Sequence, residues 1–309
     1  MKTYLIGPGA AGAAAALGAI RFLVGVDGGG TGTRVRLADA AGREIGLGTA
    51  GPSALGQGVE QAWRHIGAAI AGAAAQAGIA APAPADCAIG LGLSGVGVLA
   101  QAEGFLAANP GYPLLALDGD GWTTLLGAHG GAPGAVVAAG TGSIGEVLHR
   151  DGSRAIVGGW GWRCGDEGSG AWLGLKAVAH VQNTLDGRAA GGPLAAAVIA
   201  RTGGDRAALL HWISRSGQQD FASLAPLVFE HAADDAFAAA AVAKAVVELE
   251  KIALALDPQQ DLPLALCGSI ALRLGEGFPD RLRARCVAPR GDSAAGALTL
   301  VRHELDGLR

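Results

Sequence analysis

Two short glycine- and threonine-rich stretches, GVDGGGTGT and AAGTGSIG, contain the residue types that bind phosphate. A tight turn without bulky side chains exposes consecutive backbone N–H groups, and glycine allows a phosphate oxygen to approach them closely. Hydroxyl groups on Thr31, Thr33, Thr141 and Ser143 add further donors. Two such turns could hold a polyphosphate from both sides, although a chain with 53 glycines could also use them as plain hairpins.

Acidic residues follow two apolar runs. Asp27 ends the run FLVGVD, where its carboxylate could orient Mg²⁺ directly or through waters, or could cap the turn instead. Asp118 and Asp120 lie in LLALDGDGWTTLLGAHGG, between a strand-like run and a helix-like run. A carboxylate at the end of a parallel strand could take a proton from a substrate hydroxyl, but the same position suits a helix N-cap. The spacing alone does not choose between these two aspartates.

A third cluster, GGWGWRCGDEGSGAW, combines two acids with tryptophans in a glycine-rich loop. Asp166 and Glu167 could accept hydrogen bonds from sugar hydroxyls, and Trp160 or Trp162 could pack on a sugar ring. The alternative is a helix N-terminus with favourably placed acids.

A sheet must position these residues, and the sequence contains the same block twice. Each block reads as strand, Gly/Thr turn, strand, glycine turn and strand, followed by a helical stretch. This duplication predicts an α/β protein with two similar domains facing each other. The strands are expected at 21–27, 34–39 and 44–51 in the first block, and at 134–139, 144–150 and 154–161 in the second.

The duplication also suggests where the chain divides. We expect an extension over 1–20, an N-terminal domain over 21–125 and a C-terminal domain over 126–309, whose last helix packs back on the first domain. The apolar extension is expected to be non-essential. Its G-x-G-x-x-G pattern, starting at Gly7, is followed by too short a segment for the crossover of a dinucleotide-binding domain.

Composition narrows the class of protein. The chain has 309 residues, of which 50% are hydrophobic and 16% charged, as in a globular protein with a sizeable core. A net charge of −4 without a basic run argues against a nucleic-acid partner. No apolar run argues for a membrane span. The four separated cysteines, without a CxxC, fit reduced thiols in a cytoplasmic protein.

Six motifs in order resemble those of the bacterial glucosamine and N-acetylglucosamine kinases. This group belongs to the benzoyl-CoA-reductase-ATPase-like branch of the superfamily of sugar kinases, heat-shock chaperones and actin. The resemblance covers the chain from about Arg21 to its end. It implies an actin-like ATPase fold of two ribonuclease-H-like domains with a cleft between them, and ATP- and Mg²⁺-dependent phosphorylation of an amino sugar at its 6-hydroxyl. The motifs are GVDGGGTGTRV, DGWTTLLGAHGG, AAGTGSIG, GGWGWRCGDEGSGAWLG, LCGSIA and SAAGAL.

The resemblance also implies roles for individual residues. The catalytic aspartate of the family corresponds to Asp120, with Asp118 as the lesser candidate, and the metal-orienting one to Asp27. The residues that match the phosphate and adenosine motifs are Gly29, Gly30, Thr31, Thr33, Gly140, Thr141, Gly142, Ser143, Gly268, Ser269, Ala295 and Gly296. The residues implied in sugar binding are Ser53, Asp120, Thr141, Gly142, Trp160, Asp166 and Glu167.

One departure bears on the substrate. N-acetylglucosamine kinases usually carry an asparagine near the end of the first meander, where AGPSAL supplies Ser53. This favours free glucosamine, with N-acetylglucosamine as the alternative.

Two other functions fit parts of the pattern. An ATPase that activates a redox enzyme would need cysteines for an iron–sulfur cluster, and Cys164 has no second cysteine nearby. A sugar sensor would carry a DNA-binding module, for which the first twenty residues are too short. A homodimer is left open.

Overall fold

The chain forms two β-sheets that share an equivalent order of five strands, and one of them has an additional edge strand. The structure is a computed structural model and describes residues 3–8 and 17–308. Its strands are β1 (Tyr4–Ile6), β2 (Phe22–Gly28), β3 (Thr33–Asp39), β4 (Glu44–Ala50), β5 (Cys87–Leu93), β6 (Leu114–Asp118), β7 (Gly134–Ala139), β8 (Ser143–Leu148), β9 (Arg154–Gly158), β10 (Leu264–Cys267) and β11 (Cys286–Val287).

The sheet orders confirm the duplicated meander. One sheet runs β1-β6-β5-β2-β3-β4 and the other β11-β10-β7-β8-β9. In each, three antiparallel strands are extended by strands that lie parallel to the first of them: β5 and β6 beside β2, and β10 and β11 beside β7. The two glycine turns therefore occupy equivalent places, between the first two strands of each sheet. This is the two-domain fold of the actin-like ATPases.

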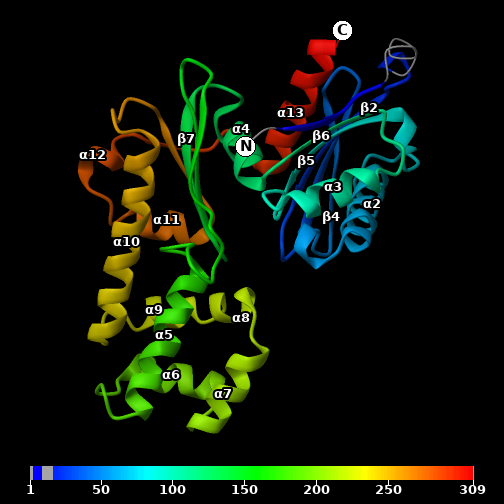
Figure 1. The fold of residues 1–309 in the computed structure, drawn as a ribbon. Coiled ribbons are helices and arrows are strands. Elements are labelled where there is room, and N and C mark those ends of the chain that lie inside the picture. Colours follow the sequence, from blue (N-terminus) through cyan, green and yellow to red (C-terminus); the bar gives the residue numbers. More distant parts are fainter. Residues whose placement is uncertain (1–2, 9–16, 309) are drawn as a thin grey trace. The chain divides into compact units, whose positions relative to one another are not determined.

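Helices follow each meander (Figure 1). In the part of the chain that is described, no helix is long and apolar enough to cross a membrane. The helices are α2 (Val59–Gln76), α3 (Leu99–Ala107), α4 (Asp120–His129), α5 (Gly170–Leu185), α6 (Pro193–Thr202), α7 (Arg206–Arg215), α8 (Gln218–Ala222), α9 (Ala225–Glu230), α10 (Ala236–Leu256), α11 (Ser269–Gly275), α12 (Asp280–Arg283) and α13 (Ser293–Leu308), with short 3₁₀ turns η1 (Leu55–Gln57) and η2 (Pro84–Asp86).

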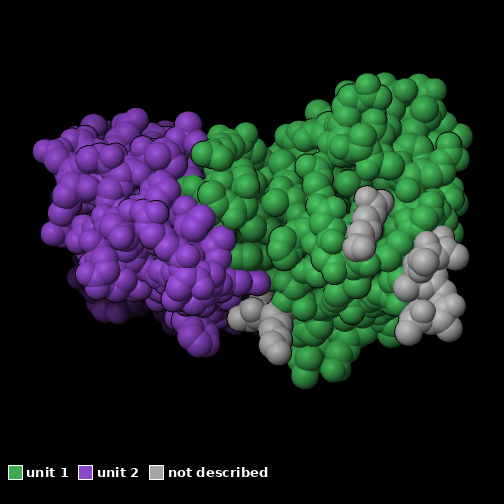
Figure 2. Space-filling view, turned by 90° about the horizontal axis from the view of Figure 1, so that it is seen from above, with its two compact units in different colours: residues 1–132, 289–309 green, residues 133–288 purple. Residues whose placement is uncertain are grey.

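The contacts divide the chain into two compact units, coloured separately in Figure 2. Unit 1 contains residues 1–132 and 289–309, and unit 2 contains residues 133–288. The expected boundary after residue 125 would cut α4, which continues to His129. The last helix belongs to unit 1 because it packs on α4, β2 and β5.

In unit 1, helices cover both faces of the sheet. On one face α2 and α3 bury Ile66 and Phe105 against the strands. On the other, α13 approaches the strands so closely that only glycine fits: a Cβ on Gly90 would lie 2.0 Å from the carbonyl oxygen of Ala297. Glycine therefore sets the position of α13, whose first turn reaches the end of β2.

The expected extension contributes to this sheet. β1 pairs antiparallel with β6, and Tyr4 and Ile6 pack against the core of unit 1. The remainder of the expectation for 1–20 falls partly outside the described residues, which omit 1–2 and 9–16.

In unit 2, α10 covers the meander and α5 begins beside the second glycine turn. Gly145 of β8 lets α10 approach, since a Cβ there would lie 2.4 Å from Ile252. The amides of Gly170 and Ala171, in the first turn of α5, bond the carbonyl oxygens of the turn. Helices α6 to α9 extend unit 2 at its lower end in Figure 1.

Candidate active site

The turn between β2 and β3 exposes backbone amides. The amide of Gly29 donates to the carbonyl oxygen of Gly32 at 3.0 Å and closes the turn. Within residues 3–8 and 17–308, no protein acceptor engages the amides of Gly30 and Thr31, and both residues are exposed. Consecutive unpaired amides form an anion-binding arrangement. The turn can therefore take a phosphate oxygen.

Ser53 supports this turn. Its amide donates to the carbonyl oxygen of Gly29 at 3.1 Å, and its Oγ lies 2.7 Å from Oγ1 of Thr33. Thr33 also donates to the carbonyl oxygen of Gly51 at 2.6 Å. Both hydroxyl-bearing residues are buried. Here they serve the bonding of the turn itself, and direct contacts of Thr33 to phosphate and of Ser53 to sugar stay predictions.

Asp27 lies next to this turn, near the end of β2. Burial raises the pKa of its carboxyl, while the charge of Arg34 and a hydrogen bond from Ser293 act in the opposite direction. Among the described residues, no group of three or more His, Cys, Asp or Glu side chains is placed to hold a metal ion. A half-buried carboxylate beside unpaired turn amides fits Mg²⁺ that is shared with phosphate oxygens and waters.

The two alternative aspartates differ in exposure. Asp118 has no exposed surface, and its carboxylate accepts hydrogen bonds from the amide of Gly119 at 2.7 Å and from the hydroxyl of Thr3 at 2.8 Å. Asp120 is the first residue of α4, is half-buried, and accepts from the amide of Gly121 at 3.0 Å. Only Asp120 therefore presents surface to a substrate, which favours it as the catalytic aspartate.

The second turn, between β7 and β8, repeats the arrangement of the first. Gly140 donates to the carbonyl oxygen of Gly142 at 2.9 Å. The carbonyl oxygens of Gly140 and Thr141 accept the amides of Gly170 and Ala171 at 2.8 and 3.1 Å. In the described part of the chain, the amides of Thr141 and Gly142 have no protein acceptor. In both turns, carbonyl oxygens accept hydrogen bonds from the protein, and two backbone amides are left to bind an anion.

Asp166 lies in the loop between β9 and α5 in an uncommon backbone conformation. Its φ is 53°, which is rare for a residue with a side chain, and it is 5% exposed. Its Oδ1 accepts the amide of Gly161 at 3.2 Å, and its Oδ2 accepts Nε2 of Gln218 at 3.1 Å. Burial raises the pKa of this carboxyl, opposed by the hydrogen bond from Gly161. A held carboxylate of this kind can accept hydrogen bonds from sugar hydroxyls.

The same loop carries Trp160 and Glu167, which are also expected to bind sugar. Trp160 is 83% exposed, whereas Trp162 packs on Phe221 with ring centroids 5.5 Å apart. Trp160 is therefore the tryptophan with a free ring face. Ser143 donates its hydroxyl to the carbonyl oxygen of Glu167 at 2.8 Å, which ties the loop to the second turn.

The residues expected on the adenosine side are divided between the units. Gly268 and Ser269, at the start of α11, are exposed, and a Cβ on Gly268 would lie 2.4 Å from the carbonyl oxygen of Ala139. Gly296 is buried where α13 crosses α4, beside the half-buried Ala295. An adenosine contact by any of the four stays a prediction.

Two features escaped the sequence analysis. Ser293, in the first turn of α13, bonds Asp27 and lies 2.8 Å from the hydroxyl of Thr123 on α4. Gln218, at the start of α8, bonds Asp166. Neither follows from local pattern, because a lone serine and a Gln-Gln pair occur on many helix surfaces.

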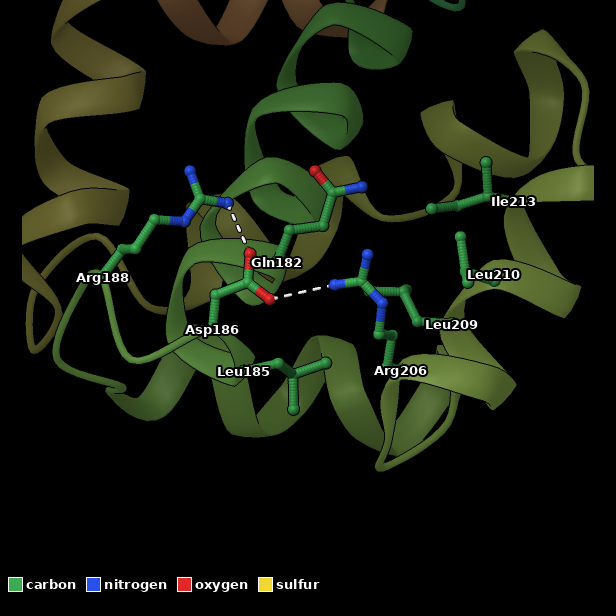
Figure 3. A pocket seen from close by; sticks show the side chains of 8 residues that line it. All are labelled: Gln182, Leu185, Asp186, Arg188, Arg206, Leu209, Leu210 and Ile213. Carbon is green, nitrogen blue, oxygen red and sulfur yellow. Dashed lines mark hydrogen bonds and ion pairs between the residues drawn. The ribbon is translucent and has the colours of Figure 1, made fainter.

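A pocket in the helical part of unit 2 contains none of the expected site residues (Figure 3). Two of its arginines, Arg188 and Arg206, are ion-paired with Asp186 at 2.8 and 3.1 Å. We assign it no part in the chemistry. Its lining consists of Gln182, Leu185, Asp186, Arg188, Arg206, Leu209, Leu210 and Ile213.

Comparison with solved structures supports the fold. A protein from Chromobacterium violaceum that is named as an N-acetylglucosamine kinase is 49% identical, with a TM-score of 0.88 over 92% of this chain and 99% of that chain. A ROK family glucokinase from Streptomyces griseus is 16% identical, with a TM-score of 0.51 over 91% of this chain and 98% of that one. The second similarity concerns the fold alone.

Sequence comparison identifies the family. The glucosamine kinase GspK of Vibrio cholerae is 30% identical over 280 residues, which are 90% of this chain and 95% of that protein. The model of the BadF/BadG/BcrA/BcrD ATPase family matches residues 24–275, which include both glycine turns, Asp120 and Asp166. The chain belongs to the BadF/BadG/BcrA/BcrD ATPase family.

Proposed function

We propose that this protein is an amino-sugar kinase that transfers the γ-phosphoryl group of ATP to the 6-hydroxyl of glucosamine, giving glucosamine 6-phosphate and ADP. The observation that carries the proposal is the pair of equivalent turns. Each leaves two consecutive amides unpaired among the described residues: Gly30 and Thr31 in one, Thr141 and Gly142 in the other. Backbone amides at glycine turns bind phosphate oxygens and stabilise charge on a transferring phosphoryl group.

Asp120 acts as the base. Its carboxylate accepts the proton of the 6-hydroxyl as that oxygen attacks the γ-phosphorus in line. The position of Asp120 at the start of α4 keeps its carboxylate partly exposed, whereas the bonds of Asp118 hold that residue in the sheet.

Asp27 orients Mg²⁺, which neutralises charge on the phosphate oxygens when it is bound. Ser293 holds the carboxylate of Asp27 from α13. The exposed hydroxyl of Thr31 is available as an additional phosphate donor.

Asp166 binds the sugar. Its carboxylate accepts hydrogen bonds from the amides of Gly161 and Ser143 and from the side chain of Gln218, and two carboxylate oxygens can accept further bonds from sugar hydroxyls. Trp160 supplies an apolar ring face, and Glu167 a second carboxylate in the same loop.

N-acetylglucosamine is the alternative substrate, favoured by the name of the Chromobacterium violaceum protein. Free glucosamine is favoured by the Vibrio cholerae relative and by Ser53, which stands where N-acetylglucosamine kinases usually carry a sugar-binding asparagine. The cytoplasmic location and a homodimer stay predictions.

The deciding experiment measures ADP release from ATP with glucosamine, N-acetylglucosamine, glucose, muramic-type sugars or no sugar. We expect release to depend on glucosamine and on Mg²⁺. Release that needs no sugar would contradict the kinase assignment, and release with N-acetylglucosamine alone would replace the substrate by its alternative.

A further inference from the structure

Two neighbouring glutamines at the start of α8 contact two parts of the proposed site. One bonds Asp166 in the loop between β9 and α5, and the other bonds the second glycine turn. Nε2 of Gln218 donates to Oδ2 of Asp166 at 3.1 Å. Oε1 of Gln219 accepts the hydroxyl of Thr141 at 3.1 Å. The sequence stretch SGQQD, which contains them, carries none of the residues assigned above to phosphate or sugar.

The bond between Gln218 and Asp166 lies directly over the second turn. A Cβ added to Gly142 would lie 2.6 Å from Oδ2 of Asp166 and 3.0 Å from Nε2 of Gln218. The glycine therefore makes room for this pair.

Packing fixes α8 in this place. Phe221 is buried, with its ring centroid 5.1 Å from that of Trp212 and 5.5 Å from that of Trp162. A Cβ on Gly174 of α5 would lie 1.9 Å from the carbonyl oxygen of Phe221, so the two helix backbones are in contact. Gln218 is half-buried at the end of this packed segment and has little freedom to leave Asp166.

We propose that Gln218 is a positioning residue for sugar recognition: its amide fixes Oδ2 of Asp166, and with it the direction in which that carboxylate accepts sugar hydroxyls. Gly161 fixes Oδ1 from within the loop, the amide of Ser143 bonds the carboxylate from β8, and Gln218 adds a side-chain constraint on Oδ2 from α8. A carboxylate held by these donors keeps its remaining acceptor directions fixed, which selects sugars whose hydroxyl donors match that geometry. The inference rests on the proposed role of Asp166.

The test compares Gln218→Ala and Gln218→Glu with the wild type by steady-state kinetics. A hydrogen bond to a charged group is removed in both, so the KM for glucosamine should rise about 10-fold in Gln218→Ala. The KM for ATP and kcat should stay within about two-fold, because uniform substrate binding is what is lost. Gln218→Glu keeps the length of the side chain but replaces the donor by a second carboxylate, and should raise this KM further.

A matched control is Gln182→Ala, which makes the same change on α5 in the pocket of Figure 3. It should leave the KM for glucosamine unchanged. Asp166→Asn tests the sugar-binding role of Asp166 separately from the positioning role of Gln218. If it raises the KM for glucosamine while both Gln218 variants match the control, Gln218 has no positioning role and the proposed function stands.

If instead Asp166→Asn leaves the KM for glucosamine unchanged, the sugar-binding role of Asp166 is wrong, and the inference about Gln218 is wrong with it. Should Gln218→Ala fail to fold, the size-matched Gln218→Glu still decides the question. A melting temperature near that of the wild type, together with an unchanged KM for glucosamine, would overturn the proposal.

Discussion

The hydroxyl groups of Thr123 and Ser293 lie 2.8 Å apart, although 170 residues separate them in the chain. Oγ1 of Thr123 also lies 3.2 Å from the carbonyl oxygen of Asp120, and Ser293 bonds Asp27. The hydroxyl pair thus connects the helix start that carries the proposed base with the proposed metal-orienting carboxylate, both within unit 1.

Thr123→Val removes this connection at nearly constant shape. We expect the free energy of unfolding to fall by about 1–2 kcal/mol, because the buried hydroxyl of Ser293 loses a partner. We also expect kcat to fall about 3- to 10-fold, because small displacements of a catalytic group are costly. Urea unfolding and steady-state kinetics measure the two effects. Thr299→Val on α13, which removes only a bond to the carbonyl oxygen of Ala295, should change neither.

Asp120→Asn tests the base itself. Asparagine keeps the shape but cannot take a proton, so kcat should fall about 10²- to 10⁴-fold while both KM values stay within a few-fold. Asp118→Asn should act mainly on stability, since Asp118 is buried and bonded to Thr3 and Gly119. Near wild-type turnover by Asp120→Asn would show that the base lies elsewhere.

Two glycines of α13 should respond to alanine in opposite directions. A Cβ on Gly296 would lie 1.8 Å from the carbonyl oxygen of Thr123, so Gly296→Ala should cost about 1–3 kcal/mol of stability by overpacking. Gly307 meets nothing within 4 Å, and Gly307→Ala should stabilise the protein by about 0.5–1 kcal/mol because alanine favours the helix. Chemical denaturation gives both values. Equal effects at the two positions would contradict the close crossing.

The ion pair of Arg36 and Asp292 should make stability depend on pH. Burial opposes ionisation of Asp292, but hydrogen bonds from Arg36, at 2.8 and 3.0 Å, and from the amide of Ala295 bring its pKa below the ordinary value of 3.8. A lowered carboxyl pKa contributes stability that is complete above that ordinary value and is lost as the pH falls through the folded-state value.

Asp292→Asn should therefore cost about 1 kcal/mol at pH 7, a modest value because the pair is partly exposed, and much less at pH 3. Asparagine can still cap α13, so the comparison isolates the charge. Urea unfolding at the two pH values measures it. A cost that does not shrink on acidification would mean that the charge is not responsible.

Substitutions in the strand β1 test whether the expected extension over 1–20 is dispensable for stability. Ile6 packs against the core of unit 1, whereas Leu5 points outward and is 46% exposed. Ile6→Ala should lower the free energy of unfolding by about 1–2 kcal/mol, and Leu5→Ala by less than about 0.5 kcal/mol. If the two substitutions have equal small effects, β1 adds nothing to the fold.

Local patterns explain why the strands and turns could be predicted. Each meander begins with a short apolar run, β2 or β7, and both glycine turns follow that run at equivalent places, so β2 to β4 and β7 to β9 could be predicted from the sequence. Asp120 required the resemblance, because an acid before a helix is also an N-cap. Its exposure in the structure favours it over Asp118, and this difference in burial could not be predicted from the spacing of the two residues in the sequence.

The contacts that hold the site could not be predicted. Gln218 and Asp166 are 52 residues apart in the chain. The sequence pattern of the helices between them gives no indication that α8 contacts the loop between β9 and α5. Ser293 contacts Thr123 where Gly127 and Gly296 let α13 approach α4 closely. Ser53 was expected at a sugar, and its buried place under the first turn depends on how the chain after β4 folds back over Gly29.

Unit 2 interrupts unit 1 in the chain, because residues 289–309 return to the first sheet. The amide of Arg290 donates to the carbonyl oxygen of Ala128 at 3.0 Å, so the segments that lead out of unit 1 and back into it lie side by side. In the chain, unit 2 is therefore an insertion into unit 1, and the two segments that connect it to unit 1 start from adjacent places. One protease cut in either connection leaves the halves joined by the other, and a short linker could replace residues 133–288 and close unit 1 upon itself.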